Sequence, residues 1–248
     1  MSDPQVKAAI VVGASGGIAQ TLIGKLLQTD SDRHVIAISR SKQDTQAITA
    51  SDSRLHWRQS NNTEESMGQI AAEIGSEPYC IDRLFICNGI LHQGSIKPEK
   101  RLKSVTYESL DAVFKANAFI PILWLKHLLP TLSPDGDNVV TVFSARVGSI
   151  DDNRAGGWYA YRASKAALNM LIKTAAIEYR RFAKNTRFLL FHPGTTETAL
   201  SAPYRSGVSP DKLFTPSFVA DRLLHLVEAL PADSILNFLD WDGKEVAW

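Results

Sequence analysis

The stretch that decides the fold is Val6-Lys7-Ala8-Ala9-Ile10-Val11-Val12-Gly13-Ala14-Ser15-Gly16-Gly17-Ile18-Ala19. Residues 6–12 are apolar and rich in β-branched side chains, as a buried strand is, and a helical pattern follows through Leu27. Gly13 permits a tight turn between the two, and the glycine pair at 16–17 lets a ligand approach the backbone. This order of strand, glycine loop and helix indicates a pyrophosphate site at a helix N-terminus; a glycine-rich turn without a ligand is the alternative.

The rest of the chain repeats the alternation of strand and helix. Five further runs that are mostly apolar predict strands at residues 35–38, 83–87, 138–143, 188–191 and 235–239, and the more polar run 55–59 is read as another strand. Helical patterns lie at residues 63–74, 106–132, 158–178 and 216–230. Apolar strands that alternate with helices, without hairpin signals, predict a parallel sheet covered on both faces. The predicted fold is therefore α/β, a single doubly wound Rossmann-type domain over residues 1–248 with a mostly parallel seven-stranded sheet.

Polar or flexible residues follow four of the predicted strands. Gly13, Arg40, Asn88 and Ser144 each stand at or just beyond a carboxyl end. Ligands of parallel α/β sheets bind beyond these ends, so we expect the four residues to surround one crevice. The segment 201–215, which contains two prolines and a glycine, is predicted to form a mobile lid over the substrate.

A tyrosine and a lysine stand four residues apart in the octet Trp158-Tyr159-Ala160-Tyr161-Arg162-Ala163-Ser164-Lys165. On a helix, Tyr161 and Lys165 share a face, and an ammonium beside a phenol favours the phenolate. Lowering the tyrosine pKa from near 10 to about 7 takes about 4 kcal/mol, which one lysine supplies only in a poorly solvated site. The pair would then donate and accept protons at neutral pH, although Tyr-x-x-x-Lys alone is also a common coincidence of helical spacing. Tyr159 has no lysine four positions on.

Asn117 lies inside the predicted helix 106–132, shortly before Pro121, which should bend that helix. Asparagine is unfavourable in a helix interior because its side chain competes for backbone groups. Asn117 marks either a local kink or a distortion that holds a carbonyl or a water, and the sequence leaves both open.

Two residues after the second predicted strand bear on the choice of cofactor. A cofactor without a 2′-phosphate usually meets an acidic side chain there, but this chain has Ser39 and Arg40. An arginine can pair with the 2′-phosphate, so we expect NADP(H) to be preferred over NAD(H). A solvated surface arginine is the alternative interpretation.

Composition excludes several classes of function. Lys and Arg number 27 against 26 Asp and Glu, so we expect no nucleic acid partner. Cys80 and Cys87 cannot form a disulfide framework, and no Cys/His cluster has the spacing of a metal site. Residues 1–5 lack the features of a signal peptide, and the most apolar segment, 118–125, is too short to span a membrane. We therefore expect a cytoplasmic protein without a membrane partner.

Taken together, these residues resemble the short-chain dehydrogenase/reductase family in its compact single-domain form. The resemblance runs from Val6 to about Leu239 and rests on five elements in the right order: Gly13-x-x-x-Gly17-Ile18-Ala19, Asn117, Ser144, Tyr161-x-x-x-Lys165 and Pro193-Gly194-x-x-x-Thr198. Leu91-His92, Pro98-Glu99-Lys100 and Asp240-Trp241-Asp242-Gly243 look most like the C-factor-like subgroup.

The resemblance implies a catalytic set. Tyr161 would be the general acid for carbonyl reduction and the base for alcohol oxidation, and Lys165 would lower its pKa and hold the nicotinamide ribose. Ser144 would hydrogen-bond the substrate oxygen, and Asn117 would anchor a water that links Lys165 to solvent. The cofactor contacts that we expect are Gly13, Ser15, Gly16, Gly17, Ile18, Ser39, Arg40, Asn88, Gly89, Tyr161, Lys165, Pro193, Gly194, Thr196 and Thr198.

The chain departs from the family pattern at three places. Val12 and Ala19 replace a threonine and a glycine of the first loop, and Ser60 stands where an aspartate usually contacts adenine. Ile86-Cys87-Asn88-Gly89 replaces the common Asn-Asn-Ala-Gly. These changes affect details of cofactor contact and leave the catalytic set intact.

Three functions are compatible with the sequence. The first is an NADP(H)-dependent oxidoreductase that interconverts a small-molecule carbonyl and an alcohol. The second is an NADP-binding sensor or signalling protein with little turnover, and the third is a sugar-nucleotide epimerase or dehydratase. Little chain follows Thr198 for the added substrate domain of the third class. The family also implies a homodimer or homotetramer, whereas the sequence does not identify the substrate or the physiological direction.

Overall fold

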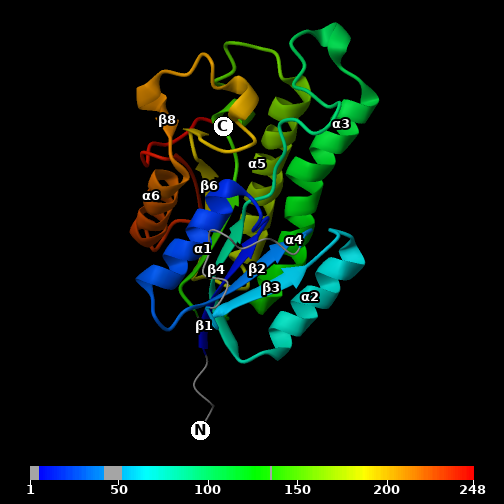
Figure 1. Cartoon of the computed structure of the whole chain (residues 1–248). Coiled ribbons are helices and arrows are strands. Elements are labelled where there is room, and N and C mark those ends of the chain that lie inside the picture. The colour runs from blue at the N-terminus through cyan, green and yellow to red at the C-terminus, as the bar shows by residue number, and fades with distance from the viewer. Residues whose placement is uncertain (1–5, 42–51, 135) are drawn as a thin grey trace.

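A seven-stranded parallel sheet forms the centre of the protein (Figure 1). The computed structural model describes residues 6–41, 52–134 and 136–248; the N-terminal residues 1–5 lie outside these ranges. The strands are β1 Val6–Val12, β2 His34–Ser39, β3 Leu55–Gln59, β4 Tyr79–Ile86, β5 Asn138–Phe143, β6 Thr186–His192 and β9 Leu236–Asp240. Their spatial order is β3-β2-β1-β4-β5-β6-β9, and every pairing is parallel. The predicted fold class is confirmed.

Helices cover both faces of the sheet (Figure 1). One face carries α1 Gly17–Thr29 and α6 Pro216–Ala229, and the other carries α2 Glu64–Ser76, α4 Ile120–Leu128 and α5 Tyr159–Tyr179, with α3 Tyr107–Phe114 leading into α4. Side chains that alternate along the strands feed two separate apolar cores, one on each face. Ile36, Trp124 and Leu168 belong to the first core, and Val11 and Leu223 belong to the second.

The order of strands reverses at β1, which lies between β2 and β4. The chain runs outward from β1 to β2 and β3, then crosses back to β4 and continues the other way. In such a sheet a crevice opens beside the first strand, beyond the carboxyl ends. The register pairs Val12 with both Ile38 and Ile86, so the loops that follow these three residues leave the sheet at one level.

The predicted helix at residues 106–132 is interrupted where Asn117 and Pro121 lie. A π-helical turn, Lys115–Phe119, joins α3 to α4, and the Ile120 N–H reaches back five residues to the carbonyl of Lys115. Pro121 has no N–H to offer the carbonyl of Asn117, so the α-helical hydrogen-bond pattern cannot continue through this point. The sequence therefore placed the distortion correctly, and the structure identifies it as a π-turn.

The same helical run is the most apolar in the described chain. Tyr107–Thr131 is long and apolar enough to cross a membrane by length and composition, with a mean hydropathy of 1.2. Its buried residues Trp124, Leu125 and Leu128 pack into the core beneath the sheet. Contact with the sheet thus accounts for its apolar face.

A second, two-stranded sheet was not predicted. Thr195–Thr196 (β7) pairs with Leu213–Phe214 (β8), and Glu197 N donates to the Phe214 carbonyl at 2.8 Å. The pair holds together the two ends of residues 197–212, which include most of the segment 201–215. That segment contains two short 3-10 turns and lies beside the site described below. Its movement as a lid stays a prediction.

Candidate active site

The glycine loop turns tightly between β1 and α1. The amides of Gly13 and Ala14 both donate to the Ile38 carbonyl, at 2.9 and 3.0 Å. Gly13 has φ of 77°, and a side chain there would begin 3.0 Å from the backbone nitrogen of Asn88. Only glycine meets both conditions without strain. Gly16, which lines the groove described below, then stands at the N-cap of α1, whose first turn has no side-chain cap.

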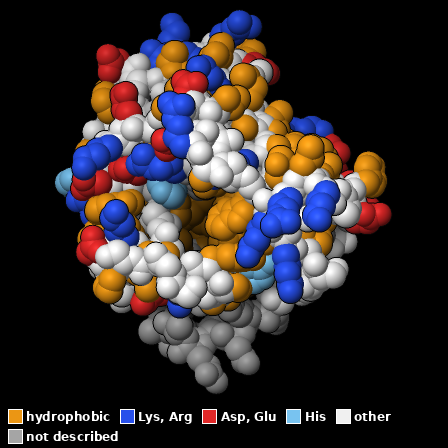
Figure 2. Space-filling view, turned by 90° about the horizontal axis from the view of Figure 1, so that it is seen from above, with side chains coloured by type: hydrophobic (Ala, Val, Ile, Leu, Met, Phe, Trp, Pro, Cys, Tyr) orange, Lys and Arg blue, Asp and Glu red, His pale blue; other side chains and the backbone are white. Residues whose placement is uncertain are grey.

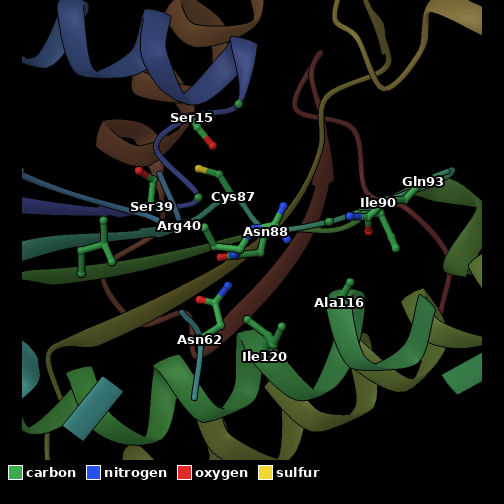
Figure 3. A pocket seen from close by; sticks show the side chains of 14 residues that line it. Ser15, Ser39, Arg40, Asn62, Cys87, Asn88, Ile90, Gln93, Ala116 and Ile120 are labelled. Atoms are coloured by element: carbon green, nitrogen blue, oxygen red, sulfur yellow. The ribbon is translucent and has the colours of Figure 1, made fainter. Parts of the chain in front are cut away.

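A groove runs from this loop across the carboxyl ends of the strands (Figure 3). Its walls come from the loops after β1, β2, β3 and β4 and from the helix around the π-turn. The lining side chains and backbone are those of Gly13, Ser15, Gly16, Ile38, Ser39, Arg40, Asn62, Cys87, Asn88, Gly89, Ile90, Gln93, Ala116 and Ile120. Seven of the predicted cofactor contacts are therefore brought together in one groove.

Two asparagines give this groove its polar character. The Asn88 Oδ1 is buried and has no hydrogen-bond partner among the described residues. A buried acceptor without a donor is costly, so it points to a ligand that donates to it. Asn62 was not predicted; it adopts φ of 61° after β3, and the Trp124 indole donates to its Oδ1 at 2.9 Å. Asparagine tolerates this left-handed conformation, and the pair Asn61-Asn62 before the N-cap Thr63 was the available signal.

The residues at the carboxyl ends of β2 and β3 differ in their exposure to the groove. Arg40 is exposed at its edge, whereas the Ser39 hydroxyl is buried and donates to the Ser41 carbonyl at 2.5 Å. Ser60, the residue in the usual aspartate position, is buried and shares a hydrogen bond with the hydroxyl of Ser66. Ser60 does not line the groove, and Asn62 does so in its place.

A second cavity, of about 310 Å³, lies beside the groove at the same end of the sheet. Figure 2 shows this end of the molecule from above, with a central hollow that has hydrophobic side chains on its inner wall and on one side. Tyr161 and Ser144 both line the cavity. Its other walls are Ile18, Leu91, Ala145, Val147, Trp158, His192, Pro193, Gly194, Thr195, Thr196, Thr198, Leu200, Ser201, Tyr204 and Val208.

Burial controls the protonation of Tyr161 and Lys165. Loss of water raises the pKa of Tyr161 to about 12 and lowers the pKa of Lys165 to about 8. The pKa of Tyr161 is therefore raised, whereas the Tyr-x-x-x-Lys spacing predicted that Lys165 would lower it. The reason is geometric: the Lys165 ammonium donates to the Phe143 carbonyl at 2.8 Å, and desolvation dominates the phenol.

Asn117 acts on the backbone of the loop after β4. Its Oδ1 accepts from Ile90 N at 2.7 Å, and its Nδ2 donates to the Ile90 carbonyl at 2.9 Å and to the Ser164 hydroxyl at 3.1 Å. The Asn117 Oδ1 and the Lys165 Nζ each lie 3.4 Å from the point where a side chain on Gly89 would begin. The π-turn thus brings Asn117 to the neighbourhood of Lys165, with Gly89 between them.

Ser144 follows β5 and is held from two sides. Its backbone N–H donates to the Phe191 carbonyl at 2.9 Å, and its hydroxyl donates to the Asn169 Oδ1 at 2.5 Å. Asn169 lies on α5 four residues after Lys165, on the same face of the helix. Asn169 was not predicted from the sequence; the available signal was an asparagine inside a helix, four residues after Lys165.

The turn after β6 closes the cavity. Gly194 has φ of 71°, and a side chain there would begin 2.7 Å from the ring of Phe214. Thr196 is buried in β7, while a methyl group of Thr198 lies 3.2 Å from the point where a side chain on Gly17 would begin. This contact places the end of the turn against the start of α1. Gly17 lines neither the groove nor the cavity and lies behind Thr198.

A buried glutamate holds the start of α5. The Glu99 carboxyl group accepts from the Ser109 hydroxyl and, at 3.1 Å, from Ala160 N in the first turn of α5. The Glu99 backbone carbonyl accepts from Trp158 N at 2.5 Å. Trp158, the N-cap of α5, has φ of 53°, an uncommon conformation for a bulky residue, and Glu99 supplies the hydrogen bonds that maintain it. Sequence spacing could not reveal this cap because Glu99 precedes the helix by about 60 residues.

Glu99→Ala should lower the free energy of unfolding by about 2 kcal/mol, because the buried Ala160 N–H and Ser109 hydroxyl both lose their acceptor. Glu99→Gln keeps one oxygen for Ala160 and should lose about half as much. Denaturant titration measures both changes. Glu108→Ala, at an exposed position nearby, is the matched control and should be close to neutral. Equal effects of Glu99→Ala and Glu108→Ala would contradict the capping role.

Comparison with known proteins places the chain in a well-populated group. A family model described as short chain dehydrogenase matches residues 7–209. The C-signal protein of Myxococcus xanthus is 31% identical over 147 residues, which are 59% of this chain and 83% of that protein. Benzil reductase ((S)-benzoin forming) of Bacillus subtilis is 26% identical over 233 residues, 88% of this chain and 92% of the reductase. The crystal structure of a short-chain dehydrogenase/reductase from Burkholderia multivorans with bound NADP has a TM-score of 0.82 at 23% identity, covering 99% of this chain and 100% of that one.

Proposed function

The chain belongs to the short chain dehydrogenase family, and from this premise we propose that it is an NADP(H)-dependent oxidoreductase that interconverts a carbonyl and an alcohol. The observation that carries the proposal is the shared cavity of Tyr161 and Ser144, which lies beside the nucleotide groove with Lys165 buried behind it. A phenol and a hydroxyl that face one cavity can both hydrogen-bond a single substrate oxygen.

The groove fits a dinucleotide. The turn at Gly13 lets a ligand approach the backbone closely, and the N-terminus of α1 carries a partial positive charge that attracts phosphate. The Oδ1 of Asn88, which has no partner among the described residues, can accept a hydrogen bond from the ligand. When bound, the nicotinamide cofactor supplies or accepts the hydride. Gly13, Ser15, Gly16 and Asn88 would hold it, with Lys165 at the nicotinamide ribose.

Tyr161 moves the proton of the reaction. In reduction the Tyr161 hydroxyl would donate a proton to the oxygen of the substrate carbonyl, whose carbon receives the hydride. The product is an alcohol. A pKa of about 12 keeps the phenol protonated at neutral pH, which suits the reductive direction. Ser144 orients the same oxygen, and Asn117 holds the loop at Ile90 that separates the groove from the cavity.

The cavity walls support an apolar substrate. Leu91, Val147, Trp158, Tyr204 and Val208 surround the position of Tyr161. The Trp158 ring lies edge-on to Tyr161, with 6.1 Å between ring centroids, and edge-on to Tyr204 at 5.4 Å. A bulky, largely apolar ketone fits these surfaces, and the similarity to a benzil reductase agrees with that class.

A screen of ketones and aldehydes with NADPH tests the proposed function. Turnover is measured as the decrease in NADPH absorbance. Turnover of at least one bulky ketone, with the alcohol identified as the product, is expected. The second candidate is an NADP-binding signalling protein. The observation that favours it is the similarity to the C-signal protein. Tight NADPH binding without turnover of any carbonyl would favour that candidate.

Arg40→Asp should weaken NADPH binding by about 50-fold, because one charge-assisted pair with the 2′-phosphate is lost and a like charge is introduced. Binding of NADH should change little, so the preference for NADPH narrows or reverses. Fluorescence titration of both cofactors measures the change. Lys184→Asp removes an exposed cation just before β6, at the amino end of the parallel strands and so away from the groove, and serves as the control. Equal affinities for NADPH and NADH in the parent protein would refute the role of Arg40.

We also propose cytoplasmic location and a homo-oligomer. Phe119 in the π-turn and Met170 and Ile177 on α5 expose 48%, 64% and 50% of their surface, respectively. Apolar side chains exposed on these helical segments offer a contact for a second copy.

A further inference from the structure

Three residues on α5 form a stripe that faces the carboxyl end of β5. Tyr161, Lys165 and Asn169 follow one another at intervals of four, so they lie on one side of the helix. Asn169 is 3% exposed, and its side chain contacts the hydroxyl of Ser144, which is 4% exposed. The stripe therefore links the proposed proton donor to the second group that would hold the substrate oxygen.

The hydrogen bond between Ser144 and Asn169 has a chemical consequence. A serine hydroxyl has one proton, and here it is donated to the Asn169 Oδ1 at 2.5 Å. In this arrangement Ser144 can accept from the cavity but cannot donate to a carbonyl oxygen. The Asn169 Nδ2 is meanwhile buried and has no acceptor among the described residues.

A half-turn of the Asn169 amide reverses this arrangement without a change in volume. The half-turn exchanges Oδ1 and Nδ2, so that Nδ2 donates to the Ser144 oxygen. The serine proton is then released and can point into the cavity. The same rotation gives Nδ2 an acceptor and leaves Oδ1, in its place, without a donor among the described residues.

Resting on the proposed function, we infer that Asn169 is the positioning residue of Ser144, with its amide directing the serine proton to the substrate oxygen. A positioning role explains the choice of asparagine at 169 better than a purely structural role does. The other buried asparagine in a helix near the site, Asn117, uses both ends of its amide in hydrogen bonds, whereas Asn169 leaves one end unused. An apolar residue would fill the place of Asn169 without a buried orphan.

A double-mutant cycle tests the inference. We expect Ser144→Ala to lower kcat for ketone reduction by about 100-fold and Asn169→Leu by about 10-fold. In the Ser144→Ala background, Asn169→Leu should have almost no further effect, because Asn169 acts through the hydroxyl that is already absent. The affinity for NADPH should stay within about twofold in all variants. Equal loss of kcat from Asn169→Leu in both backgrounds would overturn the inference.

Two further variants separate positioning from stability. When ionised, the carboxylate of Asn169→Asp offers only acceptors, so at a pH above the pKa of this carboxyl group it should hold the serine proton and lower kcat at least as much as Asn169→Leu. Asn237 on β9 also has a buried Nδ2 without an acceptor in the described part of the chain. Asn237→Leu is therefore the matched control and should leave kcat unchanged. A loss of kcat in Asn237→Leu equal to that in Asn169→Leu would assign the effect to packing.

A measurement without turnover keeps this inference distinct from the proposed function. In the NMR spectrum of the NADPH complex, the side-chain amide protons of Asn169 are assigned by their loss in Asn169→Leu. We expect them to exchange slowly with solvent and to exchange faster in Ser144→Ala. If the parent protein reduces no carbonyl, the proposed function fails, and this spectrum still decides whether Asn169 donates to Ser144. Identical exchange in both proteins would overturn the inference.

Discussion

Tyr161→Phe is expected to lower kcat for carbonyl reduction by about 1,000-fold, because it removes the hydroxyl group that we propose as the proton donor to the substrate oxygen. The phenyl ring keeps its edge-on contact with Trp158, so the cavity wall should survive the change. Binding of NADPH, measured by fluorescence titration, should remain within about twofold of the parent value. A large loss of kcat with retained cofactor binding assigns the defect to proton transfer.

Tyr159→Phe is the matched control for this variant. Tyr159 begins α5 two residues earlier, is 37% exposed and does not line the cavity. The same chemical change should therefore leave kcat close to the parent value. Near-normal turnover by Tyr161→Phe would remove Tyr161 from the mechanism, whatever Tyr159→Phe does.

Gly148→Ala is expected to reduce kcat/KM by about 100-fold through a shift of the catalytic helix. Gly148 ends a 3-10 turn after β5, and a side chain there would begin 2.8 Å from the Lys165 Cβ and 2.9 Å from the Lys165 carbonyl carbon. Real side chains do not approach this closely, so α5 must move away at Lys165. Overpacking of this kind costs about 2–3 kcal/mol of stability, which lowers Tm by roughly 4–12 °C in a domain of this size.

Gly24→Ala is the control for Gly148→Ala. Gly24 lies within α1, and a side chain there meets nothing within 4 Å. Replacement should leave activity unchanged and raise stability by about 0.5–1 kcal/mol, since alanine favours a helix. Thermal melts and steady-state kinetics measure both variants. A Gly148→Ala protein with parental kcat/KM would show that α5 accommodates the methyl group without displacing Lys165.

The prediction of the fold from the sequence worked because the evidence for it is local. The alternation of apolar strands with helical patterns identified all seven strands of the sheet, and the β-branched run at 6–12 with its glycine loop placed the crevice at the carboxyl ends. The largest error in a strand start is at β4, which begins at Tyr79 and not at residue 83, while β6 begins at Thr186, two residues before its predicted start. The two-residue strands β7 and β8 carry too little pattern to be recognised.

The structure brings predicted site residues together where their placement depends on helical spacing or on strand ends. Tyr161 and Lys165 share a face because they are four residues apart, and Ser144 reaches the same cavity because it follows β5. Asn62 and Asn169 were missed because asparagines are common in loops and helices. Their importance depends on contacts with Trp124 and Ser144, which lie 62 and 25 residues away in the chain.

By itself, then, the sequence determined the order of the elements, the end of the sheet at which a ligand would bind and the common face of Tyr161 and Lys165. Periodicity and spacing are local properties, so they can be read without coordinates. The tertiary structure alone decided that Glu99 caps α5, that Gly148 touches Lys165 and that burial raises the pKa of Tyr161. These outcomes depend on distances between remote segments and on the exclusion of water, which arise only when the whole chain has packed.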